Sequence, residues 1–277
     1  MTSTAPMIYV NVQQEQVPAL GFGTWQLTGQ ACVNAVADAL AIGYRHIDTA
    51  QGYDNEVEVG RGMRGGDVER DAVFLTTKVW RDRFTRDKLP PSVDDSLGKL
   101  GTDYIDLLLL HWPSADVPLE ETLDAMRLVQ DQGKVRHIGL SNYPPSQVRR
   151  AQQHATIFCN QVEYHPYLSQ DALLALARET NHMIAAYSPV ARGHLLDDPT
   201  LKAVADAHAK TVVQVALRWL VQQDHVCAIP KAATPAHRRS NFEIFDFELS
   251  AEEMHQIAAL DQELRVAPPP WAPDWER

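Results

Sequence analysis

Hydrophobic positions along the chain alternate between two patterns. Short apolar runs, typical of strands, lie at 19–24, 45–49, 73–79, 105–110, 136–141, 158–164, 183–188 and 226–231. Between them, apolar residues recur with a helical period at 30–42, 55–64, 86–100, 119–132, 145–154, 170–180, 200–222 and 235–242. The run IDLLLL at 105–110 is apolar almost throughout, as expected for a strand that is covered on both faces.

Eight strands that alternate with eight helices predict one α/β fold, a (β/α)8 TIM barrel that forms a single domain over residues 1–277. An open, doubly wound sheet is the alternative. It is disfavoured because no glycine-rich dinucleotide fingerprint follows the first strand: GFGTW at 21–25 lacks the third glycine and the helix start.

Three further segments lie outside the alternation. Residues 7–20, MIYVNVQQEQVPAL, alternate and then turn, which predicts an N-terminal β-hairpin across the bottom of the barrel. LSAEEMHQIAAL at 249–260 predicts an extra C-terminal helix with Ser250 as its N-cap. The last residues, RVAPPPWAPDWER from 265 to 277, carry too many prolines for regular structure, so we expect an irregular tail that docks through its tryptophans.

Composition narrows the class of protein. The formal net charge of −11 argues against a large nucleic-acid footprint, because phosphate binding needs clustered Lys and Arg. The three cysteines show no CxxC and no metal-ligand spacing, which indicates buried thiols in a reducing compartment. No signal peptide and no apolar run that could span a bilayer is visible, so we expect a cytoplasmic protein without membrane partners.

Polar residues end most of the predicted strands. Since the active site of a (β/α)8 barrel lies at the C-terminal ends of its strands, these side chains should meet at one mouth. Each has an ordinary interpretation on its own: Asp54 or Asn55 could cap a helix, and a lone Lys or His could belong to the rim. The residues at or just after strand ends are Asp48, Tyr53, Lys78, His111, Ser141, Asn142, Gln161, Tyr187, Ser188 and Lys231.

Four of these residues form a chemical set. Asp48 can pair with Lys78, and a nearby ammonium should lower the pKa of the Tyr53 phenol from its usual value near 10. Tyr53 would then be a usable proton donor near neutral pH. His111 can hydrogen-bond a substrate oxygen beside it.

The motifs GFGTW, GYRHIDTAQGYDNE, LTTKVW, DLLLLHWP, GLSNY, NQVEYHPY, AYSPVARG and IPKA occur in this order. Together they closely resemble the aldo-keto reductase family, from about Tyr9 to the C-terminus. Within that family the chain looks most like the bacterial 2,5-diketo-D-gluconate reductases and methylglyoxal reductases.

The resemblance implies NADPH-dependent reduction of aldehydes and ketones, small dicarbonyls and keto-sugar acids among them, with Tyr53 as general acid. Lys78 and Asp48 would tune this acid, and His111 would orient the carbonyl. Tyr187 would stack on the nicotinamide, and Lys231 would contact the 2′-phosphate. The other implied cofactor contacts are Ser141, Asn142 and Gln161 at the carboxamide, Ser188, Pro189 and Val190 along the pyrophosphate, and Ala232, His237 and Asn241.

The chain departs from the family pattern near Lys231. Many members have Ser and then Arg where this chain has Ala232 and His237, so Arg238 or Arg239 is a candidate replacement. The family also implies substrate-pocket walls at Trp25, Trp80 and Trp112, beside His111. Trp271 and Trp275 on the tail are candidates to close this pocket.

The connections at 112–118 and 189–199 are short, which favours small polar carbonyl substrates over bulky ones. We expect a monomer and no metal. Two other functions stay open: a metal-dependent barrel hydrolase with His46 and Asp48 as ligands, and a cofactor-holding redox-sensing module.

Overall fold

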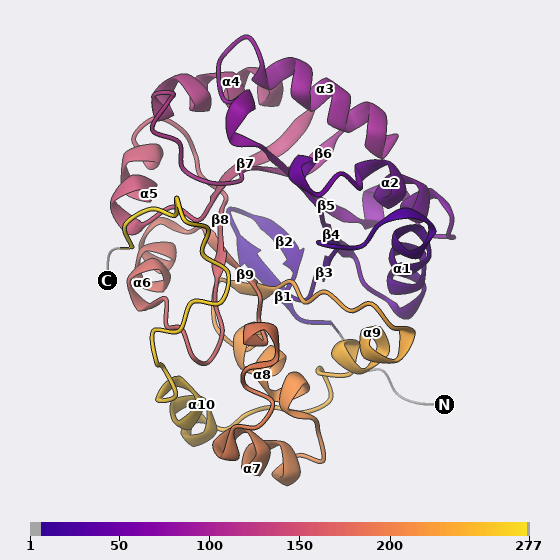
Figure 1. The fold of residues 1–277 in the computed structure, drawn as a ribbon, viewed down its shortest axis with the longest axis vertical. Helices are drawn as coiled ribbons and strands as arrows, with labels where there is room; N and C mark the ends of the chain where they lie inside the picture. Colours follow the sequence, from indigo (N-terminus) through magenta and orange to yellow (C-terminus); the bar gives the residue numbers. More distant parts are fainter. Residues whose placement is uncertain (1–6, 276–277) are drawn as a thin grey trace.

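The computed structural model describes residues 7–275, and its centre is a closed ring of eight parallel strands (Figure 1). Each strand pairs with the next one along the chain, and a bridge between Leu20 and Ala228 joins the last strand to the first. The strands are β3 (Phe22–Gly23), β4 (His46–Asp48), β5 (Phe74–Val79), β6 (Ile105–Leu110), β7 (Val135–Ser141), β8 (Cys159–Glu163), β9 (Met183–Tyr187) and β10 (Val226–Ala228). This confirms the predicted (β/α)8 barrel.

The first and last strands are shorter than their apolar runs. β10 ends at Ala228, two residues before Pro230, which has no N–H to donate to a ladder. The Pro230 carbonyl still accepts from Gly23 N at 3.0 Å, so hydrogen bonds continue the closure beyond the bridge. The first and last strands of the barrel are therefore joined by a few backbone hydrogen bonds rather than by a long ladder.

Helices surround the ring (Figure 1). The expected long helix at 200–222 is wrong: the segment forms two helices, α7 (Pro199–Ala207) and α8 (Val212–Val221). Ala209 adopts a left-handed conformation between them, and Thr211 begins α8 with a capping box to Gln214. The other helices are α1 (Gly29–Ile42), α2 (Glu56–Arg64), α3 (Leu89–Leu100), α4 (Leu119–Asp131), α5 (Pro145–Gln152), α6 (Asp171–Thr180), α9 (Pro235–Phe242) and α10 (Ala251–Ala258).

The N-terminal hairpin forms as expected from β1 (Tyr9–Val12) and β2 (Glu15–Pro18). Figure 1 looks through the ring of strands onto this hairpin, which lies at the far end of the barrel. Val12 and Val17 are buried, and the Gln13 amide donates to the Ile157 carbonyl at 3.0 Å. The hairpin thus covers one end of the barrel, and the strands end at the other.

The C-terminal segments also follow the sequence pattern. Ser250 caps α10 through a capping box with Glu253, as predicted. From there the tail runs back along the face of the barrel that Figure 1 shows. Its first backbone anchors are the amides of Gln262 and Leu264, which donate to the Tyr167 carbonyl at 3.2 and 3.0 Å. Across residues 7–275, no helix is long and apolar enough to span a membrane.

Candidate functional site

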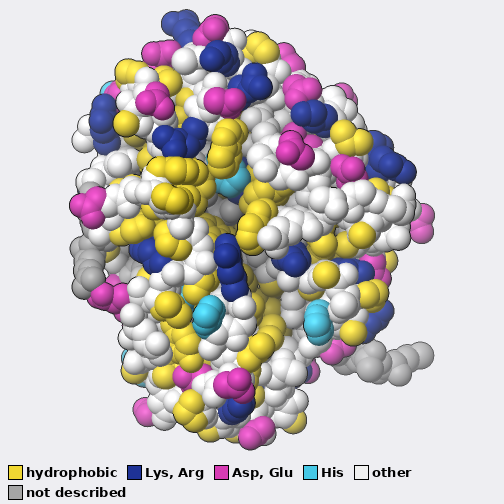
Figure 2. Space-filling model, viewed as in Figure 1, with side chains coloured by type: hydrophobic (Ala, Val, Ile, Leu, Met, Phe, Trp, Pro, Cys, Tyr) yellow, Lys and Arg dark blue, Asp and Glu magenta, His cyan; other side chains and the backbone are white. Residues whose placement is uncertain are grey.

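Parallel pairing brings the C-terminal strand ends to one face of the barrel. The register sets Asp48 beside Thr76, and Ser141 beside Gln161. Figure 2 shows a hollow near the centre of this face, surrounded by hydrophobic side chains and with a histidine beside it. A ring of mostly buried polar groups at an apolar mouth is the usual form of a small-molecule site.

Lys78 is the centre of the network below the mouth. Its side chain is fully buried, and its Nζ donates to Asp48 Oδ1 at 2.6 Å, to the Thr49 carbonyl at 2.8 Å and to the Tyr53 hydroxyl at 3.3 Å. Gln161 Nε2 donates to the other Asp48 oxygen at 2.7 Å. The ammonium therefore has three oxygen partners, which satisfies its three donors.

For both Lys78 and Tyr53, burial and the opposite charge nearby shift the pKa in opposite directions. Burial lowers the pKa of the Lys78 ammonium, but Asp48 and Tyr53 outweigh it, so the pKa lies above its usual value. Burial raises the pKa of the Tyr53 phenol, and the Lys78 ammonium offsets that only in part. The expectation of a lowered phenol pKa was wrong in direction, because the cost of burying a phenolate exceeds the attraction of the shared ammonium. Tyr53 accordingly holds its proton at neutral pH.

His111 faces Tyr53 from the end of β6. The two ring centroids are 5.6 Å apart, and the Trp80 ring lies 5.0 Å from the imidazole. Burial, with a smaller contribution from the Lys78 charge, holds the pKa of His111 well below its usual value. Its buried Nδ1 has no hydrogen-bond partner among residues 7–275. A neutral imidazole beside a protonated phenol can orient an oxygen between them.

The loop that carries Tyr53 is held by residues whose role the sequence did not reveal. Asn55 is the residue before α2, but its side chain does not cap that helix. Its amide instead donates to the carbonyls of Thr24 and Leu27 at 2.9 Å each, while Thr49 Oγ1 donates to its oxygen at 2.7 Å. Asp54 adopts a left-handed conformation rather than a cap. The only signal in the sequence is the asparagine itself, a residue type that often hydrogen-bonds backbone groups. Its partners at Thr24 and Leu27 lie in another loop, which the sequence does not show.

The residues expected to contact the nicotinamide carboxamide lie together beside the Lys78 network. Asn142 Nδ2 donates to the His111 carbonyl at 3.1 Å and to Ser141 Oγ at 3.0 Å. The Tyr187 hydroxyl donates to Asn142 Oδ1 at 2.8 Å. Hydrogen bonds thus connect Tyr187 and Ser141 through Asn142. The Asn142 backbone amide donates to the Gln161 carbonyl at 2.8 Å, and the Gln161 side chain in turn donates to Asp48.

The loop after β9 has an unusual backbone. Ser188, Ala191 and Arg192 all have φ near +50°, although none is glycine. Such conformations are uncommon for residues with a Cβ and concentrate at functional sites. The same loop contains Pro189, which is buried, and Val190, which packs partly against the core.

The residues expected at the adenosine end of the cofactor lie just before α9 and along it. Lys231 and His237 are exposed, whereas Ala232 and Asn241 are buried. Arg238 is not the expected replacement for the missing arginine. It points inward, where its Nε donates to Asp38 at 2.6 Å and its Nη1 to the carbonyls of Ala232 and Ala233, at 3.1 and 2.9 Å. Arg239 is exposed and stays a candidate.

Three of the expected tryptophans form one cluster at the mouth. The Trp271 ring contacts Trp80 at 6.1 Å and Trp112 at 5.3 Å between centroids, in edge-on geometry. Trp25 lies apart from this cluster, 41% exposed, with the Arg192 guanidinium 4.9 Å above its ring. The sequence did not single out Arg81, which stacks on Trp271 at 4.5 Å.

A model of the aldo/keto reductase family matches residues 19–262, a stretch that contains the Asp48, Tyr53, Lys78 and His111 network. The chain belongs to the aldo/keto reductase family. As an aldo/keto reductase it is an oxidoreductase that uses a nicotinamide cofactor and acts on small-molecule carbonyl substrates.

Several aldo/keto reductases are similar over nearly the whole chain. One is an aldo-keto reductase of Mycolicibacterium smegmatis, 38% identical over 269 residues, with 96% of this chain and 97% of that protein covered. Another is the methylglyoxal reductase DkgB of Escherichia coli O157:H7, 37% identical over 266 residues, with 94% and 99% covered. A solved structure described as "Crystal structure of a putative 2,5-diketo-D-gluconic acid reductase B" superposes with a TM-score of 0.95 at 44% identity, covering 100% of both chains.

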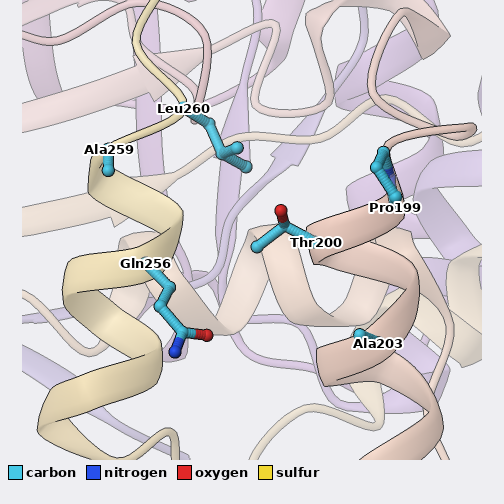
Figure 3. A pocket seen from close by; sticks show the side chains of 6 residues that line it. All are labelled: Pro199, Thr200, Ala203, Gln256, Ala259 and Leu260. Atoms are coloured by element: carbon cyan, nitrogen blue, oxygen red, sulfur yellow. The ribbon is translucent and has the colours of Figure 1, made fainter.

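Two other places in this aldo/keto reductase lack the features of a catalytic or metal site. His46 does not point to metal binding, because its ring contacts Thr76 Oγ1 at 3.2 Å, and no group of three or more ligating side chains occurs among the described residues. A shallow groove separates α7 from α10, where Thr200 and Gln256 face each other (Figure 3). Its lining contains no charged side chain and none of the residues of the Lys78 network.

Proposed function

We propose that this protein reduces small aldehydes and ketones to alcohols with NADPH, and that Tyr53 is the general acid. The observation that carries the proposal is the buried chain from Asp48 through Lys78 to Tyr53, with His111 facing the phenol. A bound nicotinamide supplies the hydride. Tyr53 donates its hydroxyl proton to the substrate oxygen, and His111 hydrogen-bonds the same oxygen.

The ammonium of Lys78 supports this proton transfer. When the phenol loses its proton, the negative charge forms 3.3 Å from Nζ, where the ammonium stabilises it. Asp48 and the Thr49 carbonyl keep the ammonium in place. In this proposal Asp48 and Lys78 adjust the acid, while Tyr53 and His111 touch the substrate.

The chain's own residues fit a nicotinamide dinucleotide along one side of the mouth. Ser141, Asn142 and Gln161 offer amide and hydroxyl groups for the carboxamide, and Tyr187 offers a ring for stacking. The left-handed loop at Ser188, Pro189 and Val190 suits a pyrophosphate, because successive backbone amides in such conformations form anion-binding concavities.

A preference for NADPH rests on the start of α9. Lys231 and His237 are exposed there, close in sequence to a helix N-terminus, which favours anions. Lys231→Met should weaken NADPH binding by roughly 10- to 150-fold, the effect of losing a hydrogen bond to a charged group. NADH, which lacks the 2′-phosphate, should bind the variant as it binds wild type.

The experiment is a fluorescence titration of both nucleotides with wild type, Lys231→Met and Lys202→Met. Lys202 is a matched control on α7, exposed and paired with Asp197. An equal loss of NADPH and NADH affinity in Lys231→Met would show that Lys231 does not read the phosphate, and Arg239 would be tested next.

The proposed activity is tested by following NADPH absorbance with methylglyoxal and other small carbonyls. Similarity to a methylglyoxal reductase and to a protein described as a "putative 2,5-diketo-D-gluconic acid reductase B" motivates these substrates. Steady-state turnover is expected, whereas binding of NADPH without turnover would favour the redox-sensing module. A monomeric state, a single domain and a cytoplasmic location stay predictions.

A further inference from the structure

Glu163, at the end of β8, holds the C-terminal tail. Its side chain is 2% exposed, and both carboxylate oxygens accept tail amides: Val266 N at 2.6 Å on Oε1 and Ala267 N at 3.1 Å on Oε2. His165 Nε2 lies 3.0 Å from Oε1. The two contacts with the tail join residues more than one hundred positions apart in sequence, so no local pattern could have revealed them.

The two amides that Glu163 binds lie directly before a run of prolines in the tail. Residues 268–270 are all prolines, which have no N–H to donate. Val266 and Ala267 are therefore the last amide donors before the proline run, and Glu163 binds both. A buried carboxylate that accepts two backbone amides makes charge-assisted hydrogen bonds, which are stronger than neutral ones.

The aromatic cluster begins just beyond the prolines. Trp271 packs on Trp80 and Trp112, and Trp80 in turn lies 5.0 Å from His111. Trp271 itself is 43% exposed, so packing covers only part of its surface. An indole held on one side by two edge-on contacts and by the Arg81 cation needs its backbone fixed if it is to form a constant wall.

We propose that Glu163 is a positioning residue for substrate binding: by fixing the start of the tail, it places Trp271 as the outer wall of the substrate pocket. The proposal rests on the proposed carbonyl reduction at Tyr53. Substrates are expected to differ in their dependence on this wall. An aromatic aldehyde is long enough to extend from His111 past Trp80 to Trp271, whereas methylglyoxal stays near His111.

The first test measures the tail without using activity. Trypsin cleaves after arginine, and the Arg265–Val266 bond carries the amide that Glu163 binds. Glu163→Gln keeps the shape of the side chain but leaves one oxygen for two amides. Cleavage at Arg265, followed by mass spectrometry, should rise at least tenfold relative to cleavage at other sites. The control is Glu179→Gln, an exposed glutamate that pairs with Arg149 on the barrel surface.

The second test separates a positioning role from general destabilisation. In Glu163→Gln, KM for 4-nitrobenzaldehyde should rise at least fivefold, while KM for methylglyoxal and the Kd of NADPH should stay within twofold of wild type. Trp271→Ala should raise KM for 4-nitrobenzaldehyde by a similar factor, and adding Glu163→Gln to it should cause no further rise, because both changes remove the same wall.

The outcomes distinguish the two proposals. Equal losses for both aldehydes, additive effects in the double variant, or unchanged cleavage at Arg265 would each overturn the positioning role of Glu163. A wild-type protein that fails to reduce either aldehyde would instead contradict the proposed function, while the trypsin experiment would still report whether Glu163 anchors the tail.

Discussion

Tyr53 is the residue on which the proposed chemistry depends most directly. Tyr53→Phe removes the hydroxyl but keeps the ring that faces His111 and Lys78. Because positioned general acids contribute on the order of 10²- to 10⁴-fold, kcat should fall at least 10²-fold while the Kd of NADPH changes less than about twofold. Stopped-flow kinetics with methylglyoxal and a nucleotide titration measure the two effects. A variant that keeps most of its activity would show that another group supplies the proton.

The pH dependence of reduction follows from the same residue. Burial raises the pKa of the phenol, so the proton donor is fully present below the usual tyrosine pKa of about 10 and is lost only above it. His111 has a pKa well below its usual value and stays neutral at pH 6 and above. The kcat/KM for reduction should therefore be level from pH 6 to 9 and fall at higher pH. A midpoint near pH 7 would contradict both assignments.

Single residues also show where sequence reasoning reaches its limit. Asp48, Lys78 and His111 could be found because each lies at or next to the end of a strand, and strand ends meet in a barrel. Asn55 and Glu163 could not, because their partners lie in distant loops and in the tail. The net direction of the Tyr53 pKa shift was missed as well, since the extent of burial is a property of the folded mouth rather than of neighbouring residue types.

Among the secondary-structure elements, the break between α7 and α8 offers the clearest test. Thr211 Oγ1 accepts from Gln214 N at 3.2 Å, and Gln214 Oε1 accepts from Thr211 N at 2.9 Å. Thr211→Ala should lower the free energy of unfolding by about 1 kcal/mol, the usual cost of losing an N-cap. Urea denaturation measures this change, and an unaltered midpoint would mean that the cap adds nothing.

Ala209, two residues before this cap, should respond in the opposite direction. Ala209 has a φ of +53°, a conformation that is strained for alanine and free for glycine. Ala209→Gly should therefore raise the free energy of unfolding, by up to about 1 kcal/mol after the entropy cost of glycine is subtracted. The same denaturation experiment tests it, and a loss of stability would show that the left-handed turn costs little.

The two helices illustrate why element boundaries are harder to predict than elements. The helical period continues from 200 to 222, so periodicity alone joins α7 to α8. The sequence does contain the signal for the break, because a threonine followed three residues later by a glutamine is a capping box. Alanine at 209 gives no such signal, since nothing in its side chain favours a left-handed turn.

At the scale of the whole molecule, the repeated alternation of strands and helices made the barrel predictable. The segments outside that alternation, the N-terminal hairpin and the C-terminal tail, lie at its two ends. The hairpin of β1 and β2 covers one end, and the tail packs at the other through Trp271. Alternating strands and helices specify the ring, but the docking of a proline-rich tail depends on contacts with Glu163, Trp80 and Trp112 that only the folded barrel provides.

The mouth as a whole should select for small carbonyls. The connections 112–118 and 188–198 at this mouth are short, and the covering surface beyond His111 includes the indoles of Trp80, Trp112 and Trp271. A steroid ketone gains affinity only for the surface that it buries, roughly 25 cal/mol per Å², and most of its rings would remain in water. The kcat/KM should therefore be higher for methylglyoxal than for a steroid ketone, measured at saturating NADPH with matched co-solvent. Benzaldehyde is the control, because its single ring can pack on the indoles without a longer wall. Faster turnover of the steroid would mean that the tail or the loop after β9 moves to cover it, and that the pocket is larger than the three tryptophans define.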